Sequence, residues 1–407
     1  MSKRGADSGF RAVLAVREFR AIWAAEAQSL LGDQMARVAL SVLAFERTGS
    51  STVTGLVYAL TFVPALVGGA TLSHLADRFP RRELMIWCDV IRAALLALMA
   101  LPGLPLTVVC GLLVLTVLAG RPFAASQIAL LPEILGGDSY VLGSGLRLVS
   151  DQIAQLVGFV AGGVVIAAVG VHSCLLIDAA TFGVSAVVLR VFVHRRPAAN
   201  TPTATDCTSG EGTSQTSLRS TISFIAGDRQ LRLLLGLGVL AGLHVVPEGV
   251  VPSYAHALGA GSVAVGVLMA ALPLGTAIGA WLVVQVPSQT RENWIGPMAV
   301  ATAIPLIACV VKPDIAASAV LWSLSGLFAA YQVPASAAFV RGVPDHRRGQ
   351  VVGLAASAVL AAQGFGVVAF GFVAEHSSAA TAVSVAGVMA MLAAIVLAVG
   401  WARRYAT

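Results

Sequence analysis

Long runs of apolar residues, separated by short polar stretches, make up most of this sequence. A helix needs about 20 largely apolar residues to cross a bilayer. On this criterion the runs predict an all-α integral membrane protein with twelve transmembrane helices. The predicted spans are 20–45, 52–75, 84–101, 105–128, 143–170, 172–193, 231–254, 261–286, 293–311, 315–338, 350–374 and 378–401.

The composition agrees with a bilayer as solvent. Of the 407 residues, 57% are hydrophobic and 11% are charged, and the mean hydropathy is +0.86. Soluble domains have about 25% charged residues. The five cysteines are scattered without metal-binding spacing, and we find no phosphate-binding or hydrolase motif. We therefore expect no metal, no cofactor and no enzymatic activity.

The basic residues lie mainly on one side of the predicted membrane. Twenty of the 26 Lys and Arg residues fall in the termini or in loops of one side, and only Arg47 and Lys312 fall on the other. Because cytoplasmic loops carry the excess of basic residues, we expect a multi-pass protein of the cell membrane with both termini cytoplasmic. The net charge of +6 then reflects membrane topology, and we expect no nucleic-acid partner.

The chain is expected to consist of two related halves. Residues 197–221 are rich in Thr, Ser, Gly and Pro, a composition that cannot bury enough apolar surface to fold. We predict a six-helix bundle at 1–193, a flexible cytoplasmic linker at 194–225 and a second six-helix bundle at 226–407, with a short interfacial helix at 222–232. At an offset of 208 residues, segment 145–165 shares nine identities in 21 positions with 353–373, which indicates a six-helix pseudo-repeat.

Charged residues inside the first span are candidates for function, because such residues are costly in lipid. Glu26, Asp33 and Arg37 fall on one helix face. We expect Asp33 and Arg37 to pair along the helix. Glu26 has no cation nearby in sequence, so we expect it to exchange protons near neutral pH.

Other intramembrane polar residues are Arg121 in the fourth span and His244 and Glu248 beside Pro247 in the seventh. Bent helices near the membrane middle often line transport sites. Four further residues are spaced as local structural pairs, Asp89 with Arg92 and Arg147 with Asp151. Asp178 is expected near an outer helix end.

Two motifs resemble signatures of a transporter family. The loop SHLADRFPRR at 73–82, with Asp77, Arg78, Arg81 and Arg82, resembles the loop between spans two and three of the major facilitator superfamily. In that family the loop is thought to lock one conformation, and the alternative is an ordinary basic cytoplasmic loop. The sequence GFVAGG, with Gly158, Gly162 and Gly163, resembles the antiporter signature of its drug exporters, and the alternative is close packing by small residues.

The resemblance extends to a branch of the family. The stretches LGDQMARVAL, ALLPEILGGDSYVLGSGLRL and VPEGVVPSYA are similar to macrolide-efflux-like members. The resemblance implies that spans one, four, seven and ten face a central cavity. It also implies a monomeric drug:proton antiporter that exports small amphipathic compounds. A metabolite importer or uniporter, and a non-transporting membrane sensor or assembly factor, remain alternatives.

Overall fold

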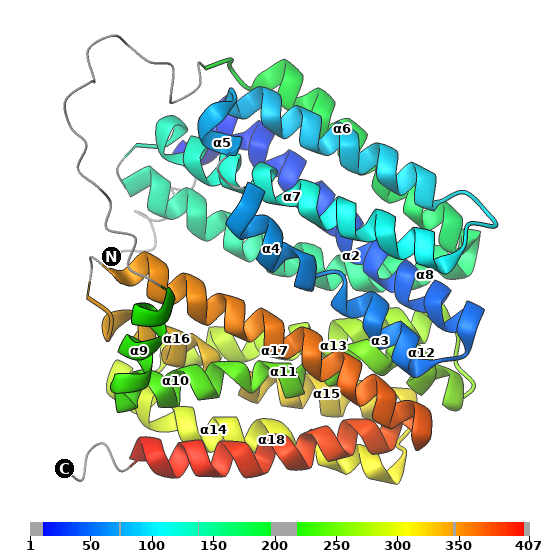
Figure 1. Ribbon diagram of the computed structural model, residues 1–407, viewed down its shortest axis with the longest axis vertical. Helices are drawn as coiled ribbons and strands as arrows, with labels where there is room; N and C mark the ends of the chain where they lie inside the picture. The colour runs from blue at the N-terminus through cyan, green and yellow to red at the C-terminus, as the bar shows by residue number, and fades with distance from the viewer. Residues whose placement is uncertain (1–10, 73–74, 137, 197–217, 345–346, 403–407) are drawn as a thin grey trace. The chain divides into compact units, whose positions relative to one another are not determined.

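The computed structural model describes residues 11–72, 75–136, 138–196, 218–344 and 347–402. Within these ranges the chain is helical and contains no strand (Figure 1). The predicted all-α class is therefore confirmed for the described residues. The chain packs as two compact units, unit 1 from residues 1–43 and 60–205 and unit 2 from residues 44–59 and 206–407.

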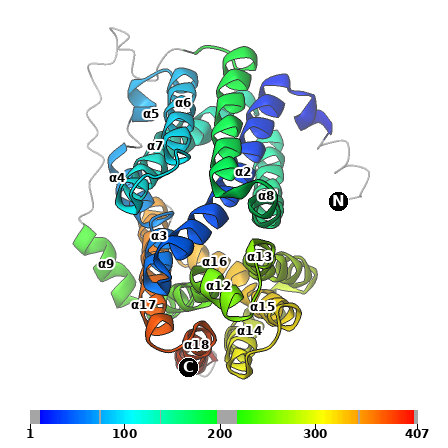
Figure 2. The ribbon, with the colours of Figure 1, turned by 90° about the vertical axis from the view of Figure 1, so that its right-hand side faces the viewer.

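The long helices of unit 1 run lengthwise beside one another in Figure 1 and are seen more nearly along their axes in Figure 2. Its helices are α2 (Arg17–Thr48), whose last turn belongs to unit 2, α4 (Val63–Leu72), α5 (Leu75–Arg78), α6 (Arg81–Met99), α7 (Leu106–Ile134) and α8 (Asp138–Phe192). Gly170, with φ 83° and ψ 169°, interrupts α8. This single residue makes the turn that the sequence placed between two spans, and its positive φ is readily adopted only by glycine.

Unit 2 begins with α3 (Ser51–Ala59) and continues after residue 206. Its other helices are α9 (Leu218–Gly227), α10 (Arg229–Val239), α11 (Ala241–His244), α12 (Val246–Ala257), α13 (Ser262–Gln285), α14 (Ser288–Ala308), the 3-10 turn η1 (Cys309–Val311), α15 (Ile315–Ala329), α16 (Gln332–Arg341), α17 (Arg348–His376) and α18 (Ala379–Ala402). Asp228 caps α10 by accepting hydrogen bonds from the N–H groups of Gln230 and Leu231. The predicted helix 222–232 is therefore wrong in extent, because this cap starts a new helix inside it.

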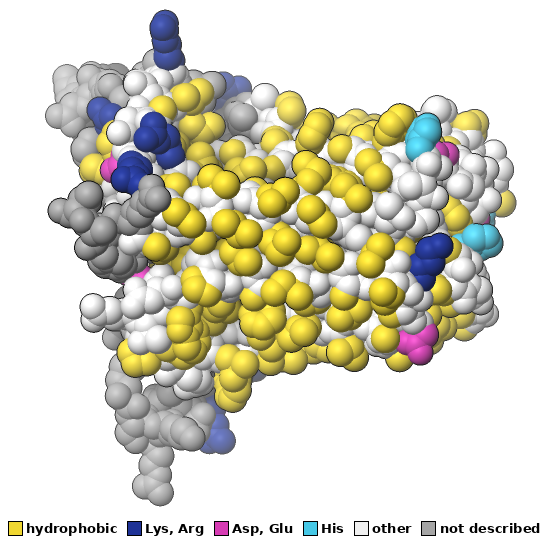
Figure 3. Space-filling view, turned by 90° about the horizontal axis from the view of Figure 1, so that it is seen from below, with side chains coloured by type: hydrophobic (Ala, Val, Ile, Leu, Met, Phe, Trp, Pro, Cys, Tyr) yellow, Lys and Arg dark blue, Asp and Glu magenta, His cyan; other side chains and the backbone are white. Residues whose placement is uncertain are grey.

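Nine helical stretches of the described chain are long and apolar enough to cross a membrane. α2 and α6 also have the length, at 32 and 19 residues, but they carry more charge. Large hydrophobic side chains such as Val67, Leu148 and Val396 are more than 60% exposed. One face of the molecule is covered by hydrophobic side chains, with the charged ones gathered toward its two ends (Figure 3). This is the surface of a multi-pass membrane protein.

Glycines bring helices into close contact at several crossings, and one crossing in each unit illustrates this. A Cβ on Gly158 of α8 would lie 2.7 Å from the Leu31 carbonyl oxygen and from the Gln34 Cβ of α2. In unit 2, a Cβ on Gly366 of α17 would collide with the Gly242 carbonyl oxygen of α11. Neither position can hold a larger residue without moving the two helices apart.

Candidate functional site

A small charged cavity lies inside unit 1, among α2, α6, α7 and α8. Its volume is about 80 Å³. The polar and charged side chains that line it are those of Asp33, Arg37, Thr61, Arg92, Thr116, Arg121 and Asp178. Asp33 and Arg121 lie near the middle of their helices, so the cavity is deep within the apolar layer. The sequence predicted three of these residues, Asp33, Arg37 and Arg121.

Asp33 is held by Arg92 of α6. The Arg92 Nη2 donates to both carboxylate oxygens of Asp33, at 2.9 and 2.8 Å. The Arg92 guanidinium also stacks on the Phe182 ring, 3.8 Å from its centroid. The predicted Asp33–Arg37 pair is therefore wrong: the carboxylate turns to an arginine of another helix, which reaches both oxygens. The predicted Asp89–Arg92 pair forms no hydrogen bond either. Asp89 instead accepts a 2.5 Å hydrogen bond from the Ser185 hydroxyl.

Asp178 completes the acidic side of the cavity. It is fully buried, and its Oδ1 fills the space beside Gly32, where it would collide with a Cβ. The Thr181 hydroxyl lies 3.3 Å from this oxygen, whereas Oδ2 has no hydrogen-bond partner among the described residues. The expected place near an outer helix end is wrong, since the residue lines the cavity next to Asp33.

Arg37 and Arg121 form no hydrogen bond or ion pair with any described residue. The Nε of Arg121 is buried and unpartnered, and its aliphatic stem packs against Gly68 of α4, where a Cβ would lie 2.7 Å from the Arg121 Cγ. A guanidinium remains charged at any physiological pH. The cavity therefore holds three arginines against two aspartates, and its formal charge is positive.

Glu26 belongs to a separate ion pair. The Arg147 guanidinium of α8 donates to both Glu26 carboxylate oxygens, at 2.6 and 2.5 Å. The expectation that Glu26 lacks a cation is wrong, because its partner comes from α8 rather than from its own helix. Asp151, the predicted local partner of Arg147, interacts with it electrostatically, but the hydrogen bonds of Arg147 go to Glu26. Glu26 precedes Asp33 by seven residues, about 10 Å along the helix.

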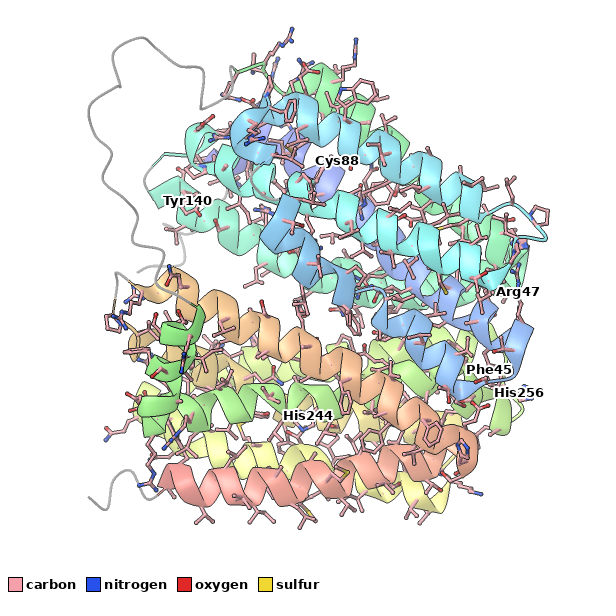
Figure 4. All side chains as sticks on the ribbon, viewed as in Figure 1. Phe45, Arg47, Cys88, Tyr140, His244 and His256 are labelled. Atoms are coloured by element: carbon pink, nitrogen blue, oxygen red, sulfur yellow. The ribbon has the colours of Figure 1, made fainter. Side chains whose placement is uncertain are left out.

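Two of the predicted residues lie in unit 2, near the break between α11 and α12. Glu248 is buried and accepts a hydrogen bond from the Tyr58 hydroxyl of α3. His244 is buried at the end of α11 (Figure 4), and neither of its ring nitrogens has a hydrogen-bond partner among the described residues. Its ring packs edge-on against Tyr331, with centroids 6.2 Å apart.

Two arginines of the basic loop, Arg81 and Arg82, contact the C-terminal ends of α7 and α8. Arg81 donates to the Ala129 carbonyl oxygen and pairs with Glu133 at the end of α7. Arg82 donates to the carbonyl oxygens of Leu189 and Arg190 at the end of α8. Cations at helix C-termini are stabilising. Arg78 is exposed, and the side chain of Asp77 lies outside what the structure describes.

Glu18 adds an ion pair at the same side. It binds the Arg196 guanidinium and accepts a hydrogen bond of 3.0 Å from the His194 N–H. Burial raises the pKa of Glu18, but the hydrogen bonds and charge of Arg196 and His194 outweigh it, so the pKa is lowered below its ordinary value. The same contact raises the pKa of Arg196.

The glycines of the antiporter-like motif contact the helix that carries Asp33. Gly158 meets Leu31 and Gln34, and a Cβ on Gly162 would lie 3.0 Å from the Met35 Cα. Gly163 is buried beside them. α8 continues without a break through the motif, and Gly170 is where its backbone leaves helical geometry. Close packing, the alternative reading of this motif, accounts for these contacts.

Sequence reasoning missed Arg92 and Asp178 as members of the cavity. Both are intramembrane charges, which is the signal that identified Asp33, but their depth and partners depend on which helices are neighbours. Within the described ranges no group of three His, Cys, Asp or Glu residues could hold a metal ion.

Comparison with known proteins gives a family match over most of the chain. The family model described as Major Facilitator Superfamily matches residues 22–311. Two curated relatives, both named macrolide efflux protein A and both from Streptococcus pyogenes, are 36% identical over 77 residues. That alignment covers 19% of this chain and 19% of each relative.

Solved structures of transporters share the fold. A bacterial homologue of the human lysosomal transporter Spinster, in an inward-facing unoccupied conformation, gives a TM-score of 0.71 at 13% identity and covers 94% of this chain and 96% of its own. The nucleoside transporter NupG, as a point mutant, gives 0.70 at 14% identity, with 94% and 99% covered. A peptide transporter, POT, as a point mutant in complex with sulfate, gives 0.72 at 12% identity, with 93% of each chain covered.

Proposed function

We propose that this chain, which belongs to the Major Facilitator Superfamily, is a proton-coupled exporter of small amphipathic compounds that works by alternating access. The family and fold make it a membrane transporter rather than an enzyme. Proton coupling and export are the further steps of the proposal. The short match to macrolide efflux protein A supports the direction and the amphipathic character of the substrate.

The observation that carries the proposal is the Asp33–Arg92 ion pair in the charged cavity. A carboxylate in the membrane interior is costly unless paired. Protonation of Asp33 would release Arg92, and deprotonation would restore the pair. Movement of one proton can therefore favour one arrangement of α2 and α6 over another, which is the coupling that an antiporter needs. Glu26 with Arg147 and Glu248 with Tyr58 are further candidate proton sites on the same reasoning.

The topology is part of the same proposal. We infer twelve transmembrane helices in two six-helix pseudo-repeats, with the halves at 1–193 and 226–407, both termini in the cytoplasm, and a monomer in the cell membrane. The basic loop with Asp77, Arg78, Arg81 and Arg82 would then lie at the cytoplasmic face. The helix-end contacts of Arg81 and Arg82 support its role in holding one conformation.

A reconstituted assay tests the coupling. Inside-out vesicles with an imposed pH gradient would be supplied with a labelled amphipathic compound that scores in a growth-inhibition panel, and uptake would be measured for the native chain and for Asp33→Asn. We expect the variant to lose gradient-driven uptake. The matched control is Glu46→Gln, which also neutralises an acid on α2 but at an exposed position. Full gradient-driven uptake by Asp33→Asn would exclude Asp33 as the coupling residue.

The direction of flux separates the alternatives. An importer or uniporter would move the compound equally well without the gradient, or in the opposite sense in these vesicles. A non-transporting sensor or assembly factor would show no flux, and neutralising Asp33 would leave its cellular phenotype unchanged. A growth-inhibition panel with and without expression, followed by transport of any compound that scores, identifies further substrates.

A further inference from the structure

We propose that the charged cavity of unit 1 binds the oxyanion group of the transported compound, through Arg37 and Arg121. The inference rests on the proposed transport function and names a substrate class for it, an amphipathic organic anion such as a carboxylate. Neither the matching family description nor the macrolide-efflux relatives assign such a preference.

The first argument is the charge of the cavity. Three arginines and two aspartates line it, and the ion pair within it joins only Arg92 and Asp33. Arg37 and Arg121 form no ion pair with a described residue, and Asp178 is the one acidic side chain left to face them, so the cavity keeps one net positive formal charge. A charge inside a membrane protein is expensive unless it is paired, so a site built this way gains from a bound anion.

The second argument is the chemistry of the free groups. A guanidinium presents a planar fork of N–H donors that matches the two oxygens of a carboxylate. The Nε of Arg121 is buried and has no partner within the described ranges. An incoming oxyanion would accept hydrogen bonds from this side chain and from Arg37 and would also balance their charge, whereas a neutral acceptor cannot balance the charge and a cation can do neither.

The third argument is size. The cavity holds about 80 Å³, and a cavity needs about 10–15 Å³ on this kind of measure to hold one water. The space suits an oxyanion of a few heavy atoms. The apolar remainder of an amphipathic substrate would have to lie outside this cavity. The cavity therefore recognises the charged group of a compound and places little restriction on the shape of its apolar part.

Binding of three matched probes tests the proposal. The full-length protein in lipid nanodiscs would be titrated with 2-naphthoate, 2-naphthylmethanol and 2-naphthylmethylamine at constant ionic strength, which share a ring system and differ in charge. We expect 2-naphthoate to bind about 10- to 100-fold more tightly than the alcohol, as for a charge-assisted hydrogen-bonded pair. Arg121→Gln and Arg37→Gln should each remove most of this preference.

Controls separate binding from folding. Arg121→Lys keeps the charge without the fork and should retain part of the preference. Arg229→Gln removes an exposed arginine of α10 and should change nothing. Unchanged binding of the alcohol by Arg121→Gln shows that this variant is folded.

Tighter binding of the amine, no binding of any probe, or an undiminished preference in both glutamine variants would overturn the proposal. Sulfate that binds as tightly as 2-naphthoate would also overturn it, since the site would then hold inorganic anions.

A transport assay distinguishes the anion-site proposal from the proposal of proton-coupled export. The protein used for the binding measurements would be reconstituted into vesicles, and flux of the same probes would be measured. Gradient-driven flux of the amine but not of 2-naphthoate would overturn the anion inference and leave the antiporter proposal standing. A preference for 2-naphthoate without gradient-driven flux of any probe would support the anion site and overturn proton-coupled export.

Discussion

The two aspartates of the cavity differ in their surroundings, and their contributions to stability should differ accordingly. Asp33 accepts two hydrogen bonds from Arg92, whereas the Oδ2 of Asp178 has no partner in the described chain. We expect Asp33→Asn to lower the free energy of unfolding by about 1–3 kcal/mol, because it leaves a charged donor with a weaker acceptor.

Asp178→Asn should cost clearly less, since it removes no ion pair. The melting temperature of the two variants in the same detergent provides the comparison, and Glu46→Gln serves as the neutral reference. Equal losses in the two asparagine variants would mean that Asp178 balances the arginines as strongly as Asp33 does.

Glu18 supplies a stability term that depends on pH. Its pKa is lowered in the folded protein, so the contact with Arg196 stabilises the protein above the ordinary pKa of a glutamate. This stabilisation is lost as pH falls through the lowered value. The difference in melting temperature between the native chain and Glu18→Gln should therefore be largest near pH 7 and shrink toward pH 4. A difference that grows on acidification would show that the carboxylate is not stabilised in the folded state.

The sequence predicted which charged residues line the cavity better than it predicted which arginine each carboxylate pairs with. Asp33, Arg37 and Arg121 could be chosen from the sequence because an intramembrane charge is costly and is kept for a reason. The partners could not be chosen, because spacing along one helix identifies only local pairs. Asp33 and Glu26 instead pair with arginines of α6 and α8, and that choice is made by tertiary packing.

Helix crossings give a prediction at the scale of whole elements. Gly158 meets Gln34 on α2, and Gly366 meets Gly242 on α11. Both members of the first pair lie 208 residues before those of the second, the same offset that relates the sequences of the two halves. The crossing is therefore used twice, which supports the proposed pseudo-repeat.

Alanine substitutions test this pairing of contacts. We expect Gly158→Ala and Gly366→Ala each to destabilise the protein by about 1–3 kcal/mol through overpacking. The matched controls are Gly145→Ala and Gly353→Ala, which are also 208 residues apart and where a Cβ would meet nothing within 4 Å. Thermal unfolding should show a loss in the first two variants and none in the second two. A loss at only one of the crossings would show that the two halves pack differently there.

The positions of most helices could be predicted from apolar runs of membrane length. The points at which the helices break could not be predicted from these runs. Gly170 turns the chain with one residue, and Asp228 starts a helix by capping its first turn. α3 ends at Ala59 and joins unit 2, while α4 belongs to unit 1. These breaks depend on backbone torsions and on packing partners, and the hydropathy of a segment contains no information about either.

At the scale of the whole molecule, each half closes its Arg-rich end with an ion pair between corresponding helices. In unit 1 the pair joins Arg81 at the start of α6 to Glu133 at the end of α7. In unit 2 it joins Glu292 near the start of α14 to Arg341 at the end of α16, at 2.7 Å. Position 341 lies 208 residues after position 133, and the charges are exchanged. A comparable contact is present in both units although the residues differ, which supports the proposed pseudo-repeat.

Orientation in the membrane can be tested with the only two lysines of the sequence, Lys3 and Lys312. The excess of basic residues predicts that they lie on opposite sides. Lys312 is exposed between η1 and α15, and Lys3 lies outside the described residues. A membrane-impermeant amine reagent, read by peptide mass spectrometry, should label Lys312 in intact cells and Lys3 only after permeabilisation. Lys312→Arg controls for the assignment of the labelled peptide.

Protection of Lys312 in intact cells, with labelling in inside-out vesicles, would show that the topology is the reverse of the one proposed. It would also place the Arg81–Glu133 and Glu292–Arg341 pairs outside the cell and reverse the sense of the proton gradient that export requires.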